Sequence, residues 1–345
     1  MQFGPFDLGP AEPVLVVAEV GVNHNGDRDL GLRQLRAAAK TGAQAVKFQS
    51  FDAEELAEAS APLAEYQTRS ANSGQLAMLK GLELADADFA AYLREGEALG
   101  VVVFSTPFDA TNARRLAKAG AKLMKVPSGE ITNLDLLRAI ATTKLPTIMS
   151  TGMSELDEVR RAVDVFTGAG GGPLALLHCV SSYPAPLEQM NLRAIETLRH
   201  EFDVPVGLSD HSIGPAAAIA AVALGAVIVE KHFTIDRTLP GPDHAMSTEP
   251  EQFADLVATL RQLQAGLGSG RKTAMPTEIE VRGVARRSLF ATRAIRAGSP
   301  ITPDLLAAKR PGGGIGPDRI DSVVGKSARR DIEAGAMLRP EDLTD

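Results

Sequence analysis

Residues 225–234 read GAVIVEKHFT. The apolar run Ala226 to Val229 is followed at once by Glu230, Lys231 and His232. A continuous apolar run of this kind is typical of a strand that is buried on both faces, as in a parallel sheet. Charged groups at the end of such a strand need a function or a partner, and whether the pattern recurs in the chain decides how it is interpreted.

The pattern recurs along the chain, and it predicts an α/β fold. The apolar runs with polar ends are VLVVAEVGVN (14–23), AVKFQSF (45–51), VVVFSTPF (101–108), KLMKVPSGE (122–130), PTIMSTGM (146–153), LALLHCVSSYP (174–184), PVGLSDHS (205–212) and VIVEKHFT (227–234). Amphipathic Ala/Leu-rich stretches such as 30–42, 111–120, 133–143 and 154–166 lie between them, which indicates strands that alternate with helices. Eight such units favour a TIM (β/α)₈ barrel. A doubly wound open sheet is the alternative, and it usually carries a G-x-G-x-x-G turn that this chain lacks.

The polar strand ends predict an active site. In a TIM barrel the catalytic groups lie at the carboxyl ends of the strands, so these side chains should converge on one face. The segment 52–86, between the second strand and its helix, is longer than an ordinary βα loop. We expect it to cover the substrate, with a short helix near Gln75–Lys80; it includes APLAEYQTRS (61–70).

Composition excludes several classes of protein. The 345 residues carry a formal net charge of -7, which argues against a surface dedicated to nucleic acid. The lone cysteine, Cys179, cannot form an intrachain disulfide, which favours a reducing cytoplasm. The N-terminal segment has neither the basic nor the apolar region of a secretory signal. The apolar run 216–229 is too short for a membrane span, so we expect a cytoplasmic enzyme without membrane contact.

A second, smaller domain is predicted after the barrel. We expect the barrel to comprise residues 1–269, a linker 270–285 and a β-rich domain 286–345. RAIRAGSPITPDLL (293–306) and RDIEAGAMLRPEDL (330–343) form an internal repeat with an offset of 37, each copy with a short strand, an Ala-Gly turn and a Pro that opens a short helix. Thr302 is a candidate N-cap. Residues 286–345 carry 11 Lys/Arg and 8 Asp/Glu, net +3, which leaves -10 for residues 1–285.

Two histidines predict a metal site. His211 and His232 follow strands seven and eight at equivalent positions. Because neighbouring strands lie about 5 Å apart, the two imidazoles can share a divalent first-row ion such as Mn²⁺ or Zn²⁺. The alternative is that they make hydrogen bonds within the barrel mouth. Asp210 either orients His211 or caps a loop, and Lys231 is expected on the other side of its strand.

Two lysines raise the question of their anionic partners. Lys47 and Lys125 protrude from strands two and four, where an unpaired ammonium is costly. Either Glu19 and Glu130 neutralise them, or they bind a phosphate. The hydroxyls that would then assist are those of Ser128, Ser150 and Ser209.

The remaining candidates suit a hydroxyl-rich substrate. They are Glu19, Gln49, Glu130 and Asp243, of which Glu130 is the best candidate for acid–base catalysis. Three other residues have structural interpretations. We expect His24 to stabilise a turn, His178 to lie too far back in its strand, and Cys179 to pack in the core.

The ordered motifs resemble the sialic acid synthase family, which includes N-acetylneuraminate, legionaminate and pseudaminate synthases. They are AEVGVNHNGD (18–27), VKFQSF (46–51), STPFD (105–109), KVPSGEITNLDLL (125–137), MSTGM (149–153), LLHCVSSYPAP (176–186), VGLSDHS (206–212), EKHFT (230–234), GPDH (241–244) and KRPGGGI (309–315). The resemblance covers essentially the whole chain. It implies a barrel followed by an antifreeze-like (SAF) domain of β-clip type. It also implies a transferase that condenses phosphoenolpyruvate with a 2-acetamido hexose and releases phosphate by C–O cleavage.

The resemblance also implies roles for individual residues. His211 and His232 match metal ligands, with Mn²⁺ first and Mg²⁺ or Co²⁺ as alternatives. Matches to phosphoenolpyruvate contacts are Lys47, Lys125, Ser128, Ser150, Ser209 and Ser181, the last of which replaces an Asn of some members. Matches to the sugar site are Glu19, Gln49, Thr106, Glu130, Tyr183 and Asp243. Arg310 matches an arginine that one subunit extends into the barrel of another, which implies a domain-swapped homodimer.

The acceptor sugar is the least determined part of the prediction. GPDH and APLAEYQ are more similar to N-acetylneuraminate and legionaminate synthases than to pseudaminate synthases. N-acetylmannosamine is our first expectation, and 2,4-diacetamido-2,4,6-trideoxymannose is the second. Two other classes remain as alternatives: a metal-dependent aldolase that uses pyruvate, and a binding module in which an SAF domain recognises ice or glycans.

Overall fold

The computed structural model describes residues 1–58 and 74–344. The chain divides into two compact units, Met1–Gly268 and Ser269–Asp345. Each unit is described by itself below. Residues 59–73 lie outside the described part, and the expected substrate-covering stretch 61–70 lies among them.

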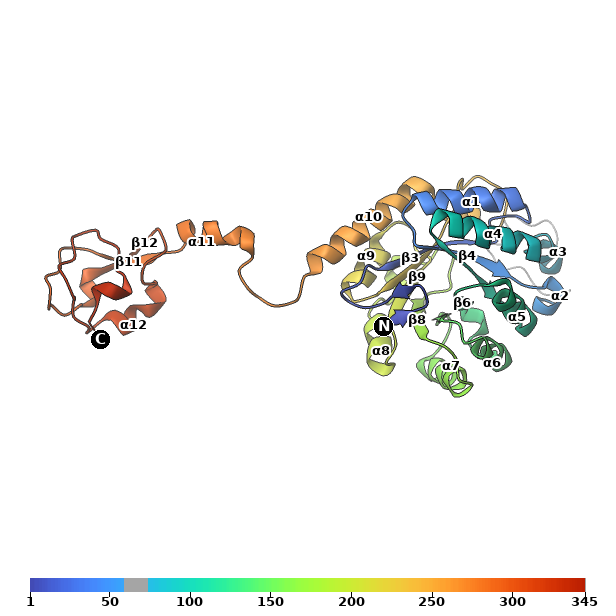
Figure 1. Cartoon of the computed structure of the whole chain (residues 1–345), viewed down its shortest axis with the longest axis horizontal. Coiled ribbons are helices and arrows are strands. Elements are labelled where there is room, and N and C mark those ends of the chain that lie inside the picture. The colour runs from blue at the N-terminus through green and yellow to red at the C-terminus, as the bar shows by residue number, and fades with distance from the viewer. Residues whose placement is uncertain (59–73, 345) are drawn as a thin grey trace. The chain divides into compact units, whose positions relative to one another are not determined.

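The first unit is a closed barrel of eight parallel strands, with the order β10-β3-β4-β5-β6-β7-β8-β9 (Figure 1). The strands are β3 (Leu15–Gly21), β4 (Ala45–Ser50), β5 (Val102–Pro107), β6 (Met124–Val126), β7 (Thr147–Ser150), β8 (Leu174–Cys179), β9 (Val206–Asp210) and β10 (Ile228–His232). Each lies within one of the apolar runs of the sequence. The predicted barrel is therefore confirmed, and the open sheet is excluded because β10 pairs with β3 along Ile228–His232.

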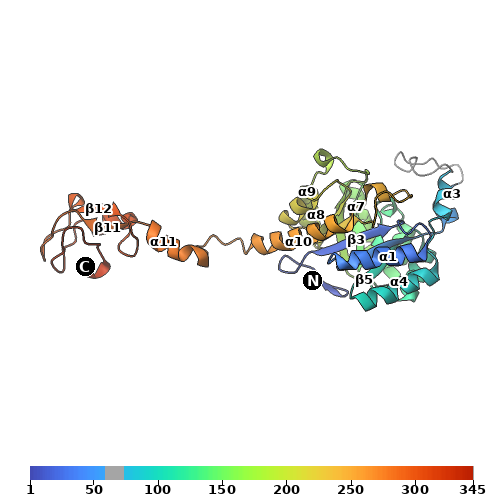
Figure 2. The ribbon, with the colours of Figure 1, turned by 90° about the horizontal axis from the view of Figure 1, so that it is seen from above.

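Helices form a ring around the strands, and α1 and α4 lie side by side (Figure 2). The ring comprises α1 (Arg28–Lys40), α4 (Asp86–Leu99), α5 (Ala110–Ala119), α6 (Leu134–Thr142), α7 (Leu156–Gly168), α8 (Ala194–Glu201), α9 (Ala216–Ala223) and α10 (Pro250–Leu267). Their apolar faces pack on the outward-facing strand residues to form the largest core of the unit. Among the described helices, none combines the length and apolarity needed to cross a membrane.

Local sequence sets where these helices begin and end. Asp27 accepts hydrogen bonds from the backbone N–H groups of Asp29 and Leu30, and Asp109 accepts one from that of Asn112. These are N-cap contacts that satisfy otherwise unpaired donors. Gly120, at the end of α5, has a φ of 98°, a conformation that glycine adopts without steric cost.

A second core fills the amino-terminal half of the barrel. Because successive strand residues face opposite sides, Val17, Ala45, Phe104 and other inward residues stack there. The chain begins with a hairpin that the sequence analysis missed, β1 (Gln2–Phe3) and β2 (Phe6–Asp7). Its Phe3 is completely buried in this core, so the hairpin closes the amino end of the barrel.

Two short helices follow β4 on the carboxyl side of the barrel. They are α2 (Ala53–Leu56) and α3 (Gln75–Lys80), and α3 is the short helix expected at these residues. A small apolar cluster joins them to the barrel, with Phe51 and Leu82 buried and Leu79 half-buried.

The second unit has its own core around Leu289, Ile301 and Leu338. It contains α11 (Ile279–Ala285), β11 (Ser288–Ala291), β12 (Leu306–Lys309) and α12 (Ile320–Val323). β11 and β12 are antiparallel. The stretch 270–285, which has the composition of a linker, therefore contains the helix α11.

The internal repeat has a symmetric structure. Ile295 and Ile332, which are equivalent in the two copies, exchange both backbone hydrogen bonds at 2.8 Å. Each copy ends in a one-turn 3₁₀ helix that opens with proline, Pro303–Leu305 and Pro340–Asp342. Thr302 holds the N-cap position, but its hydroxyl donates to the Asp304 side chain instead of capping the turn.

Candidate active site

A cavity of about 740 Å³ opens at the carboxyl ends of the barrel strands. This volume is typical of a site for small molecules. Most of the predicted site residues line it: Glu19, Lys47, Gln49, Thr106, Lys125, Ser128, Ser150, Ser181, Tyr183, Ser209, His211 and His232. The structure therefore brings together side chains from β3, β4, β5, β6, β7, β8, β9 and β10.

The pleat of β10 decides which of its charged residues reach the cavity. Glu230 and His232 line it, whereas Lys231 points to the opposite face, as expected. Lys231 Nζ donates to Asp210 Oδ2 at 2.7 Å. Asp210 also accepts from the Ser212 hydroxyl at 2.7 Å. Asp210 thus pairs with Lys231 and Ser212, so the alternative that it orients His211 is wrong.

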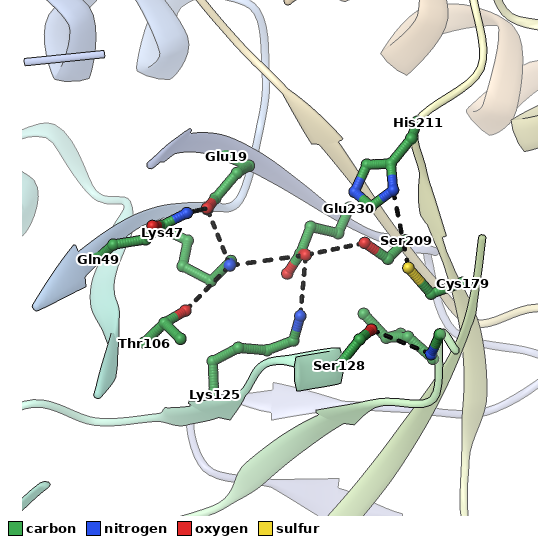
Figure 3. A network of polar contacts seen from close by, with 12 residues as sticks. Glu19, Lys47, Gln49, Thr106, Lys125, Ser128, Cys179, Ser209, His211 and Glu230 are labelled. Carbon is green, nitrogen blue, oxygen red and sulfur yellow. Dashed lines mark hydrogen bonds and ion pairs between the residues drawn. The ribbon is translucent and has the colours of Figure 1, made fainter. Parts of the chain in front are cut away.

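Two buried lysines share one carboxylate at the centre of the cavity (Figure 3). Lys47 Nζ lies 3.0 Å from Glu19 Oε2 and 3.6 Å from Glu230 Oε1. Lys125 Nζ lies 2.9 Å from the same Glu230 oxygen. All four side chains are at most 5% exposed. Of the two candidate partners Glu19 and Glu130, only Glu19 pairs with a lysine, and Glu230, which the sequence analysis did not select, takes the second place.

Hydroxyl and amide groups complete this network. Ser209 Oγ donates to Glu230 Oε1 at 3.1 Å, and Lys47 Nζ donates to Thr106 Oγ1 at 3.1 Å. Gln49 Nε2 donates to Glu19 Oε1 at 3.2 Å. Gly21, at a bulge in β3 with a φ of 56°, makes room for this last contact, because a Cβ there would lie 3.1 Å from Glu19 Oε1.

The two carboxylates have opposite pKa shifts. Burial alone would raise the pKa of Glu230, but the charges of Lys125 and Lys47 outweigh it and lower the pKa to about 2. For Glu19 burial dominates over the attraction of Lys47, and the pKa rises to about 7. The lysine pair therefore favours the ionised form of Glu230, whereas burial favours the protonated form of Glu19.

Glu130 occupies a different position from the one expected. The chain leaves β6 through the 3₁₀ turn Ser128–Glu130. The Glu130 carboxylate accepts a hydrogen bond from Asn133 Nδ2 at 2.8 Å and does not line the cavity. Glu130 therefore does not contact the lysine pair, contrary to the alternative in which it neutralises the lysines. Its role in acid–base catalysis stays a prediction.

Serine hydroxyls cluster on the side of β6, β7 and β8. The Gly152 backbone N–H donates to Ser128 Oγ at 3.0 Å. A Cβ on Gly152 would lie 2.4 Å from Ser181 Oγ and 2.8 Å from Ser128 Oγ, so glycine is required for this close approach. The buried Ser150 Oγ lacks a hydrogen-bond partner within the described structure. These hydroxyls, next to Lys125, can donate to the oxygens of an anion.

The two predicted metal-binding histidines lie next to each other. Their ring centroids are 5.4 Å apart. The ring of Tyr183 lies against both, with centroids 4.2 Å from His211 and 5.8 Å from His232. Asp243 Oδ2 is 3.9 Å from His232 Nδ1, and burial raises the Asp243 pKa to about 6.

The histidine pair fits a divalent ion. His211 Nδ1 lies 2.9 Å from the Val180 carbonyl oxygen, which leaves Nε2 available. The buried His232 Nδ1 has no hydrogen-bond partner among the residues that the structure describes. Neutral imidazole is the metal-binding form. Burial lowers the His232 pKa well below its usual value, whereas for His211 burial is outweighed by the contact with Cys179, which raises the pKa. The described residues contain no group of three or more His, Cys, Asp or Glu arranged to hold a metal. An ion here would complete its coordination with water or substrate.

Three predictions outside the core of the site have clear outcomes. His24 stabilises a turn as expected, since its Nδ1 accepts from the Gly26 backbone N–H at 3.0 Å. His178 bonds to the Met190 carbonyl oxygen and does not line the main cavity. Cys179 is buried, but it lines the cavity with Sγ 3.7 Å from His211 Nδ1. Arg310 is exposed within the second unit.

Two features of the cavity were missed by sequence reasoning. The first is Glu230, which the two-residue strand period would have placed on the same face as His232. The second is a group of apolar lining residues in α2 and α3 or directly after β4, α2 and β5: Phe51, Leu56, Ala57, Leu79 and Phe108. Their signal in the sequence is weak because apolar residues in a long loop are equally consistent with packing.

Comparison with known proteins identifies relatives along the whole chain. Residues 34–272 match the model of the NeuB family, and residues 286–344 match the SAF domain. An N,N'-diacetyllegionaminic acid synthase of Legionella pneumophila is 42% identical over 341 residues, which is 97% of this chain and 96% of the relative. An enzyme of Campylobacter jejuni with the same name is 39% identical over 94% of this chain and 98% of the relative. The crystal structure of an N-acetylneuraminic acid synthetase from Leptospira borgpetersenii has a TM-score of 0.73 and 36% identity over 81% of this chain and 94% of that one.

Proposed function

Because the chain belongs to the NeuB family, we propose that it condenses phosphoenolpyruvate with an open-chain 2-acetamido hexose and releases inorganic phosphate. The observation that carries the proposal is the buried network in which Lys47 and Lys125 share Glu230 beside a cluster of serine hydroxyls. Buried ammonium groups next to serine hydroxyls suit a small phosphorylated carboxylate.

We propose 2,4-diacetamido-2,4,6-trideoxymannose as the acceptor, with N,N'-diacetyllegionaminate as the product. Two relatives with that named product, at 42% and 39% identity, support this choice over our first expectation, N-acetylmannosamine. N-acetylmannosamine is the second candidate, because the sialic acid synthetase of known structure is 36% identical. The pseudaminate precursor has less support, since a pseudaminic acid synthase is 32% identical.

Charge balance supports the participation of a further cation. Histidines apart, the charged groups among the described lining residues are Glu19, Glu230, Lys47 and Lys125, and their formal charges cancel. Phosphoenolpyruvate brings two to three negative charges. The site therefore favours an additional positive charge when this substrate binds.

We propose that His211 and His232 hold a divalent ion, with Mn²⁺ as the first choice. Such an ion would act as a Lewis acid that polarises the aldehyde oxygen of the acceptor. The protein side chains position the substrates. Lys125, Ser128 and Ser150 bind the phosphate and carboxylate oxygens, and Tyr183 packs over the histidine pair.

We propose the following reaction for these groups. The C3 carbon of phosphoenolpyruvate forms a bond to C1 of the sugar, and water adds to C2. The bond between C2 and the oxygen that carries phosphorus then breaks, and C2 becomes a ketone carbon. The two protons of the water end on the new C4 hydroxyl, formerly the aldehyde oxygen, and on the phosphate. Orientation of two substrates in one cavity and fixed ammonium charges provide most of the acceleration.

Glu19 is the better candidate for proton transfer, in place of Glu130. Its carboxyl lies within the network, 3.0 Å from Lys47 Nζ and 3.2 Å from Gln49 Nε2. A buried carboxyl at this point is close enough to the charged centre to deliver a proton to the aldehyde oxygen and to receive one from the attacking water. Glu130, outside the cavity lining, has no such access in this conformation.

We propose a homodimer in which Arg310 of one chain completes the barrel of the other. The second unit is net basic, with +3 for residues 286–345, and the remaining residues are net acidic, with -10. Charges of opposite sign favour association of these surfaces. An exposed arginine supplies a bidentate donor for a carboxylate or phosphate, and it adds the positive charge that the lining lacks.

A phosphate-release assay tests the proposal. The enzyme is incubated with phosphoenolpyruvate, Mn²⁺ and each acceptor sugar in turn, and phosphate and the ketoacid product are quantified. Equal amounts of phosphate and of a product with three added carbons are expected. An aldolase would use pyruvate and release no phosphate, and a binding module would release none under any condition.

A further inference from the structure

The cavity has an apolar side that the proposed chemistry does not use. Phe51, Leu56, Ala57, Leu79 and Phe108 line it next to the charged network. We refer to these five residues as the apolar wall. No step at the reacting carbons needs them, because carbon–carbon bond formation and phosphate release take place at the lysines, serines and histidines.

The apolar wall is a packed structure. Phe51 is 5% exposed, and its ring meets that of Phe108 edge to face, with centroids 5.8 Å apart. Leu56 on α2 and Leu79 on α3 belong to the same cluster, and both are half-buried. Buried Phe51 thus supports Leu56 and Leu79, whose partly exposed side chains can contact a ligand.

The strand order places the wall opposite His211. Phe51 and Phe108 follow β4 and β5, whereas His211 follows β9, on the other side of the closed barrel. An acceptor whose C1 lies beside His211, as the proposed function requires, would extend its C4–C6 end toward β4 and β5. That end would then face the wall.

The side chains of Leu56 and Leu79 offer no hydrogen-bond partner to a sugar hydroxyl. Among the polar lining groups, Gln49 already donates to Glu19, and Thr106 accepts from Lys47. A sugar hydroxyl placed against Leu56 or Leu79 would lose contact with water without a new hydrogen bond to the wall. A methyl group or the methyl of an acetamido group would instead bury apolar area.

We propose that the apolar wall determines acceptor specificity by binding the C6 methyl and the C4 acetamido group of 2,4-diacetamido-2,4,6-trideoxymannose. This assignment rests on the proposed function. N-acetylmannosamine carries hydroxyls at both positions, so it makes the same contacts at C1 and C2 but poorer ones at the wall. Apolar pockets discriminate against a single added hydroxyl by on the order of a hundredfold at most. We therefore expect a preference of about tenfold to a hundredfold in kcat/KM.

The experiment compares the two sugars in wild-type enzyme and in Leu79→Gln and Leu56→Gln variants. The ratio of kcat/KM for the diacetamido sugar to that for N-acetylmannosamine is measured at saturating phosphoenolpyruvate. Each substitution should lower this ratio by about fivefold or more and leave the KM for phosphoenolpyruvate unchanged. Met78→Gln is the matched control, because Met78 lies in the same cluster on α3 but does not line the cavity.

The possible outcomes separate this assignment from the proposed function. Wild-type enzyme that releases no phosphate with either sugar overturns the proposed function and this assignment with it. Activity with an unchanged ratio in both variants, or an equal change in Met78→Gln, overturns the assignment alone. Because the two substitutions lie on different helices, the test remains valid if one variant misfolds. Circular dichroism and the KM for phosphoenolpyruvate verify the fold of each variant.

Discussion

Lys125 Nζ and Glu230 Oε1 lie 2.9 Å apart in the middle of the barrel mouth, and the same oxygen is 3.6 Å from Lys47 Nζ. Three ionised groups therefore occupy a site that is almost closed to water. Removal of one partner from such a buried group leaves an uncompensated charge, which costs about 3–5 kcal/mol. Glu230 therefore holds the two ammonium groups in place and competes with a ligand anion for their charge.

The variant Glu230→Gln tests this role. It removes the shared anion without a change in shape, so the two ammonium groups become available to another anion. We expect kcat to fall by about a hundredfold because the lysines lose their positions. Inorganic phosphate should at the same time inhibit the variant at lower concentration than wild type.

Ser209→Ala is the control for this experiment, since it removes one neutral donor to the same oxygen. A modest loss of activity with unaltered phosphate inhibition is expected there. Steady-state kinetics with phosphate as inhibitor gives both quantities. An unchanged inhibition constant in Glu230→Gln would contradict the charge-balance argument.

The proposed metal site predicts reversible loss of activity. Dialysis against a chelator should abolish phosphate release, and Mn²⁺ should restore it, because the histidine pair needs an ion to polarise the acceptor. His232→Gln should bind Mn²⁺ weakly, as measured by electron paramagnetic resonance of the free ion. His178→Gln is the comparison, because that ring bonds to the Met190 carbonyl oxygen away from the cavity, and it should bind Mn²⁺ as wild type does.

Exchange of second units between subunits predicts complementation. Arg310→Ala and His211→Ala should each be inactive alone. The first lacks the arginine that one subunit is proposed to supply to the other, and the second lacks a proposed metal ligand of the barrel. After unfolding and refolding together in equal amounts, half of the dimers contain one intact site, and about a quarter of wild-type activity should return. Arg296→Ala, also exposed in the second unit, should be active alone. A mixture that stays inactive would contradict the proposed exchange.

His24 predicts a pH dependence of stability. Burial lowers its pKa from 6.5 to about 4, so the folded state favours the neutral ring. The unfolded chain binds the proton first as pH falls, and stability present above pH 6.5 is lost on the way to pH 4, by roughly 3 kcal/mol. His24→Asn keeps an acceptor for the Gly26 N–H but cannot titrate. Urea unfolding at pH 7 and pH 5 should show a smaller loss in the variant than in wild type, and equal losses would refute the assignment.

The barrel was predictable because each strand carries its own signal. A strand covered by helices on one side and packed inside a barrel on the other needs apolar residues at nearly every position. Val14–Val17 and Ala226–Val229 have that composition, and polar residues begin where the strand reaches the cavity. The hairpin of Gln2–Phe3 and Phe6–Asp7 was missed, since two-residue strands show no periodicity.

The site was predictable in its residue types and less so in its pairings. Lys47 and Lys125 were identified by their position among apolar neighbours, and the cost of burial correctly required anionic partners. The choice between Glu130 and Glu230 depends on backbone geometry, because the chain after Val126 turns into a 3₁₀ helix and carries Glu130 away. Glu130 is only five residues from Lys125 in the sequence, but Lys125 pairs across the barrel with Glu230.

The hairpin that carries Phe3 has a consequence for the order of events in catalysis. Phe3 is completely buried beneath the inward residues of the strands, so the reactants enter and leave from the opposite end. Lys125, Ser150 and Glu230 are at most 4% exposed, whereas Leu79 and Phe108 lie nearer to solvent. Under the proposed function, the phosphorylated substrate would occupy the floor of this blind well and the sugar would lie above it. Such a well would impose a sequence on these reactants: the enol phosphate would bind before the sugar, and the sugar acid would leave before the phosphate ion.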